Sequence, residues 1–85
     1  MDRLDEIAVA LATDPPTDQE TAQLLDVARD VAHRAERVIT PLSTFLLGMN
    51  VQRRMSEGMG RPEALAAAIG DLRDALPPAP GPTQG

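Results

Sequence analysis

The sequence contains no cysteine, one histidine and one aromatic residue, and each scarcity excludes a class of site. Without cysteine, the chain forms neither a disulfide nor a thiolate metal site. A single histidine, His33, argues against a zinc site built by this chain alone. No apolar run approaches the roughly 18 residues that a membrane span requires. We therefore expect no metal, no cofactor and no membrane partner.

The length and charge narrow the expectation further. At 85 residues the chain is one small domain, which needs either good helix packing or oligomerisation for stability. The net charge of −5 makes nucleic acid an unexpected partner. The start, MDRLDEIAVALA, has acidic residues and no long apolar core, unlike a secretory signal. These features predict a cytoplasmic protein.

The abundance of alanine, leucine and arginine favours helices, and four segments show the helical period. The first segment has its apolar residues at Leu4, Ile7, Ala8 and Leu11, and we expect the two prolines that follow to end it. The last segment, opened by Pro62, has an apolar stripe made of Leu65, Ala68, Ile69, Leu72 and Leu76.

The second segment opens with a capping-box pattern, in which Thr17 caps the helix and Glu20 reaches back to it. We expect this helix to end near Arg37 or Val38, since Pro41 disfavours helical geometry at Thr40. Its predicted apolar stripe consists of Leu24, Ala28, Val31 and Ala35, flanked by Leu25, Ala32 and Val38.

The third segment is expected to begin with Thr40 as N-cap and Pro41 in the first turn. It has two apolar stripes on roughly opposite sides, which is typical of a central helix or of one with a second partner surface. One stripe is Leu42, Phe45, Leu46 and Met49, and the other is Leu47, Val51 and Met55. We expect Met49 in the core, and Leu47, Val51 and Met55 as candidate contacts with another chain.

The sequence thus predicts an all-α fold, a small four-helix bundle of three main helices plus an N-terminal helix. Residues 1–76 form the helical domain. Residues 77–85, PPAPGPTQG, are predicted to be a disordered tail, since their proline, glycine and polar content cannot build a core.

The polar face of the second segment raises the question of chemistry. Asp26, Asp30, His33 and Arg37 fall on one side, opposite the apolar stripe. An acid–histidine pair at this spacing occurs in metal bundles and in general-base catalysis, but no second histidine and no nucleophile accompanies it. We expect no catalytic residue and no metal ligand. Asp30, His33 and Arg37 stand as candidate partner or ligand contacts, or else as a solvated face or a brace for the following turn.

The stretches LLDVARDVAH, ER, PLSTFLLG and RPEALAAAI, between Leu24 and Leu76, resemble a family of small actinobacterial proteins, domain of unknown function 6457. Members usually have a glycine after the histidine, where this chain has Arg34. The resemblance implies a context, since such domains are often fused to or encoded near molybdenum-cofactor guanylyltransferases and formate dehydrogenase accessory proteins. It transfers no catalytic residue.

The leading hypothesis is a non-enzymatic helical interaction or accessory module, acting as a homodimer or on a protein partner, with an expected link to molybdenum-cofactor or formate dehydrogenase maturation. The alternative is a small ligand- or cofactor-binding protein that uses the polar face around His33.

Overall fold

The computed structural model describes residues 3–78, and within them it contains four α-helices, one short 3₁₀ helix and no strand. The elements are α1 (Arg3–Ala10), α2 (Asp18–Arg34), η1 (Arg37–Ile39), α3 (Thr40–Ser56) and α4 (Arg61–Ala75). The predicted all-α fold with four helices is confirmed. Of the predicted tail, residues 79–85 lie outside the described part of the chain.

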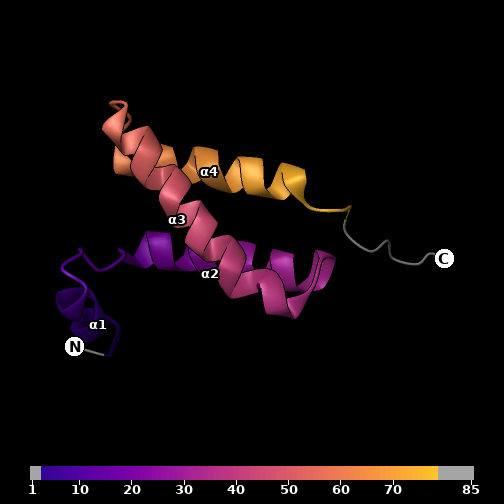
Figure 1. Ribbon diagram of the computed structural model, residues 1–85, viewed down its shortest axis with the longest axis horizontal. Helices are drawn as coiled ribbons and strands as arrows, with labels where there is room; N and C mark the ends of the chain where they lie inside the picture. The colour runs from indigo at the N-terminus through magenta and orange to yellow at the C-terminus, as the bar shows by residue number, and fades with distance from the viewer. Residues whose placement is uncertain (1–2, 79–85) are drawn as a thin grey trace.

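Three long helices form the packed unit. α3 crosses α2 and α4 on one side and contacts both, and α2 also contacts α4 (Figure 1). A helix that touches both others is central, as the two apolar stripes of this segment predict. The core lies where the three meet, and its clustered buried residues are Val27, Leu47, Leu65, Ala68 and Ile69.

The core confirms the predicted stripe of α4, and in α2 it confirms Val31, which is buried, and Leu24, which packs against the core. Val27 and Val31 are the fully buried side chains of α2, whereas Leu25 is 61% exposed. The buried face is therefore rotated from the predicted one, because α3 and α4 approach α2 from the side of these two valines. Val38 is 71% exposed, since the chain has already left the helix at that point.

The start of α2 follows the sequence pattern, and its end does not. The Thr17 hydroxyl accepts a hydrogen bond from the Glu20 amide at 3.1 Å, and Glu20 accepts one from the Thr17 amide at 2.9 Å. This capping box satisfies two amides that a helix start leaves unpaired. α2 ends at Arg34 rather than near Arg37, because the chain turns there and forms η1 before α3.

The predicted N-cap of α3 is wrong. Thr40 is already the first helical residue, and Ile39 occupies the cap position without a side-chain hydrogen bond. The 3₁₀ turn of η1 runs directly into α3, so Thr40 is in the helical region and cannot cap. Its hydroxyl oxygen is buried and has no hydrogen-bond partner among the described residues.

Two helices end in the same hydrogen-bonded motif. After α3, the amides of Gly58 and Met59 donate to the carbonyls of Met55 and Arg54 at 3.0 Å each. Gly58 has φ +106°, a left-handed conformation that favours glycine. α1 ends in the same way with Ala12 at φ 57°, so this motif, rather than the prolines, terminates the helix.

α1 lies at the edge of the molecule, beside the start of α2 (Figure 1). Its Ala8 is buried, but Leu4, Ile7 and Leu11 are 44%, 46% and 67% exposed. Within the described chain no other helix packs along α1. The packed unit therefore consists of α2, α3 and α4, with α1 attached to one end of it.

We predict that Val31→Ala lowers the free energy of unfolding by about 2 kcal/mol, because it removes two fully buried methyl groups and leaves a cavity. Val38→Ala is the matched control, since Val38 is 71% exposed, and it should change stability by less than about 0.5 kcal/mol. Urea unfolding followed by circular dichroism measures both. If the two variants lost the same unfolding free energy, the burial of Val31 in the core would be contradicted.

Candidate functional site

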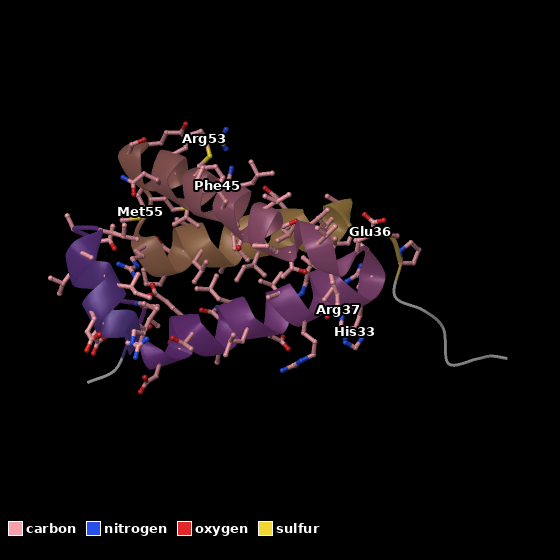
Figure 2. All side chains as sticks on the ribbon, turned by 60° about the horizontal axis from the view of Figure 1, so that its bottom comes forward. His33, Glu36, Arg37, Phe45, Arg53 and Met55 are labelled. Atoms are coloured by element: carbon pink, nitrogen blue, oxygen red, sulfur yellow. The ribbon has the colours of Figure 1, made fainter. Side chains whose placement is uncertain are left out.

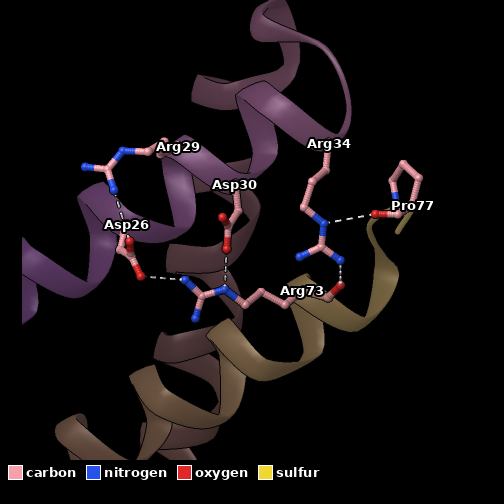
Figure 3. A network of polar contacts seen from close by, with 6 residues as sticks. All are labelled: Asp26, Arg29, Asp30, Arg34, Arg73 and Pro77. Carbon is pink, nitrogen blue, oxygen red and sulfur yellow. Dashed lines mark hydrogen bonds and ion pairs between the residues drawn. The ribbon is translucent and has the colours of Figure 1, made fainter. Parts of the chain in front are cut away.

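The polar face of α2 is partly covered by α4. The Arg73 guanidinium of α4 donates hydrogen bonds to Asp30 at 2.7 Å and to Asp26 at 3.0 Å (Figure 3). The hydrogen bond to Asp30 is the largest reason why the pKa of Arg73 lies above its ordinary value. Asp26 also accepts from Arg29 at 3.2 Å. These carboxylates therefore join α2 to α4 and are already occupied.

Arg34 makes a second connection between the same helices. Its guanidinium donates to the backbone carbonyls of Pro77 at 3.0 Å and Arg73 at 3.4 Å (Figure 3). These carbonyls belong to the end of α4 and the residues after it, where the last helical oxygens have no partner within the helix. Arg34 thus caps α4 from α2, and Pro77, expected to belong to a disordered tail, is held by it.

The structure leaves His33 and Arg37 outside the ion pair that Asp30 makes with Arg73. His33 and Arg37 lie exposed at the far end of α2 and in η1 (Figure 2). Neither side chain makes a hydrogen bond or an ion pair with the described residues. Asp30 and His33 remain one turn apart on α2, but only Asp30 is held by Arg73, and Arg37 lies beyond the end of the helix at Arg34. The predicted brace from His33 or Arg37 to the following turn is wrong for residues 3–78.

The most buried ion pair of the described chain lies at the opposite end of α2. Glu20, whose side chain is 9% exposed, receives two hydrogen bonds of 2.8 Å from the Arg61 guanidinium of α4. Arg61 also reaches the Pro15 carbonyl at 3.5 Å. Burial raises the pKa of Glu20, but the Thr17 amide and Arg61 outweigh burial and hold that pKa below its ordinary value of 4.5.

An open groove of about 650 Å³ runs beside this ion pair, between α2, α3, α4 and the segment that follows α1. Leu47, Val51 and Met55 form part of its wall. The Glu20–Arg61 pair closes its polar side, and the Thr44 hydroxyl donates to the Pro41 carbonyl at 2.8 Å. The groove is mostly apolar, and these polar groups are already paired within the chain.

The expectation that Leu47, Val51 and Met55 contact another chain needs correction at Leu47 and stays a prediction for the other two. Leu47 is only 5% exposed and belongs to the core, and Val51 packs against it. Met55 is half-buried. α2 and α4 pack over Leu47, whereas Val51 and Met55 stay partly accessible along the wall of the groove.

The other stripe of α3 is the exposed one, which sequence reasoning missed. Leu42, Phe45, Leu46 and Met49 are 60%, 68%, 63% and 56% exposed. We call this set the outer face of α3; the expectation that Met49 lies in the core is wrong. No local signal separates the two stripes, because Arg54 lies on the side of the buried Leu47 and its ion-pair partner, Asp71, is on α4.

Within residues 3–78, no group of three or more histidine, aspartate or glutamate side chains is arranged to hold a metal ion. No helix in the same part of the chain is long and apolar enough to cross a membrane.

The chain belongs to the family described as domain of unknown function (DUF6457), whose sequence model matches residues 1–82. The match extends beyond the Leu24–Leu76 region that carries the resemblance and includes α1. The comparisons with curated proteins and with solved structures found no match.

We predict that Glu20→Gln lowers the free energy of unfolding by about 2 kcal/mol at neutral pH, because Arg61 loses its buried charged partner and keeps only the exposed Asp14 at 3.9 Å among the described residues. A lowered pKa in the folded state gives stability that is present above the ordinary pKa of 4.5 and is lost as pH falls through the folded value. The difference between the two proteins should therefore shrink in acid. Urea unfolding at several pH values measures it.

Glu6→Gln is the control for that experiment, because Glu6 is 75% exposed and pairs with Arg3 of its own helix. Its stability should follow the wild type at every pH. A Glu20→Gln difference that stays constant into acid would contradict a carboxylate with a lowered pKa.

We predict that His33→Ala changes the free energy of unfolding by less than about 0.5 kcal/mol, because His33 is exposed and without a partner in residues 3–78. Asp30→Ala should cost about 1 kcal/mol, because it breaks a half-buried pair with Arg73. Thermal and urea unfolding of both variants test this. A larger loss of unfolding free energy from His33→Ala would show that His33 makes a stabilising contact.

Proposed function

We propose that this member of the DUF6457 family is a non-enzymatic interaction module that docks on another protein through the outer face of α3. The observation that carries the proposal is the exposure of Leu42, Phe45, Leu46 and Met49, each more than half accessible on one helix face. Contiguous exposed apolar side chains on a small protein mark an interaction site. Aromatic residues and methionine are enriched in the cores of such interfaces.

The polar groups support a binding role rather than catalysis. Asp26, Asp30 and Glu20 each accept hydrogen bonds from arginines of their own chain. An acid or base whose proton is to move must reach a substrate, and these carboxylates point at arginine instead. The alternative ligand site around His33 draws no support from the geometry, since Asp30 is engaged on α4.

The family resemblance supplies the context of the proposal. We propose that the chain acts as an accessory module in molybdenum-cofactor or formate dehydrogenase maturation in the cytoplasm. A docking role of this kind needs no catalytic residue and no bound cofactor in the module itself.

We predict that Phe45→Glu weakens association with the partner at least about tenfold, because a charge in place of a central aromatic must be buried unpaired. Purified molybdenum-cofactor guanylyltransferase and a formate dehydrogenase accessory protein are the partners to titrate, by calorimetry, alongside the chain itself by sedimentation equilibrium. The fold should be retained, because Phe45 is 68% exposed.

Leu25→Glu is the matched control. Leu25 is 61% exposed on α2, away from the outer face of α3, so this variant places the same charge at a similarly accessible leucine. Association should survive Leu25→Glu and fail with Phe45→Glu. Two results would contradict the proposal. One is that Phe45→Glu associates as tightly as the wild type; the other is that the wild-type chain associates neither with itself nor with either protein.

A further inference from the structure

The outer face of α3 is open to a large, flat partner. α3 crosses over α2 and α4 on one side of the molecule, so its outer face projects beyond both neighbours (Figure 1). Leu42 to Met49 extend along about 10 Å of helix at 1.5 Å per residue. A second helix laid alongside would cover all four apolar side chains.

Two unpaired charges of opposite sign flank this apolar stripe. Glu36 precedes it, in the corner between α2 and η1, and Arg53 follows it near the end of α3. Both are exposed, and neither side chain makes a hydrogen bond or an ion pair with the described residues. Figure 2 shows Arg53 on the same side of α3 as Phe45, whereas Arg37 lies with His33 on the other side of the molecule.

The positions of these charges fit a twofold axis. Counted along the chain, the midpoint of the stripe falls between Phe45 and Leu46, and the midpoint between Glu36 and Arg53 falls one residue earlier. Glu36 itself lies in the corner before η1, beyond the first turn of α3. A twofold axis near Phe45 therefore centres the apolar contact and also brings Arg53 of each copy toward Glu36 of the other. A parallel pairing would instead place like charges together at both ends, which is unfavourable.

We propose that the occupant of the outer face of α3 is a second copy of this chain, packed with α3 antiparallel to its counterpart and with two symmetry-related Glu36–Arg53 pairs. The inference rests on the proposed function, since it names the partner of the same surface. Twofold dimers with self-complementary interfaces are the commonest oligomers. With four large apolar side chains from each copy, the interface belongs to the small class, and its dissociation constant should lie in the micromolar range.

Charge exchange tests the pairing directly. Glu36→Arg alone and Arg53→Glu alone each turn both pairs repulsive, so each should raise the dissociation constant at least about tenfold in low salt. The double variant restores both pairs and should return the dissociation constant to near the wild-type value. An equimolar mixture of the two single variants should form a heterodimer, because both of its pairs are attractive again. Sedimentation equilibrium at about 1–200 µM covers the expected range.

The controls separate this pairing from a general effect of charge. Glu6→Arg and Arg3→Glu make the same charge changes on α1, where both side chains are at least 75% exposed, and should leave the dissociation constant unchanged. Glu36 and Arg53 lie outside the core, so circular dichroism should show an unaltered fold in every variant.

Each outcome has a distinct reading. Dimers that are insensitive to Glu36→Arg overturn the antiparallel pairing, and a wild-type chain that stays monomeric over the whole range overturns the second copy as occupant. If the chain is a monomer but binds either maturation protein, and Phe45→Glu abolishes that binding, the proposed function is still upheld. If the wild-type chain neither self-associates nor binds either maturation protein, both this inference and the proposed function are overturned.

Discussion

The carboxylate of Glu20 is the contact on which the arrangement of the helices depends. It completes the capping box that begins α2, and it also receives both arms of the Arg61 guanidinium at the start of α4. Arg61 extends the connection to the Pro15 carbonyl, so one buried charge pair links α2, α4 and the segment after α1. Removing Arg61 leaves the Glu20 carboxylate, which is 9% exposed, without its charged partner, and this is more costly than losing a surface pair.

Arginine bridges of this kind compensate for a modest core. The buried apolar residues are valine, leucine, isoleucine and alanine, and the single phenylalanine lies outside them. Arg34 and Arg73 add a second set of hydrogen bonds between α2 and α4, at the opposite end from Arg61. A planar guanidinium suits this task, because it reaches two acceptors at once with fixed geometry. The helix pair is held at both ends, and the apolar residues fill the space between.

Much of the fold was accessible from sequence, because helix periodicity, the Thr17–Glu20 capping box and the glycine turn at Gly58 are local signals. The outer face of α3 was not accessible in this way, since both stripes of α3 are apolar and the choice between them depends on where α2 and α4 pack. The contacts around His33 were also not accessible from sequence, although the polar face of α2 on which it lies was predicted correctly. Its neighbours there, Asp26 and Asp30, pair with Arg73, a residue 43 positions beyond Asp30. Long-range pairings of this kind leave no periodic trace.

The chemistry of the bridges also limits how the molecule can be regulated. All eight basic residues of the chain are arginine, so every cation in the inter-helix contacts keeps its charge at any pH that a cell experiences. Acetylation of side-chain amines, which removes the charge of lysine, has no target in these contacts. In these ion pairs only the carboxylate partner can be neutralised. Low pH can therefore weaken the contacts between the three helices, whereas the covalent modifications that act on lysine cannot.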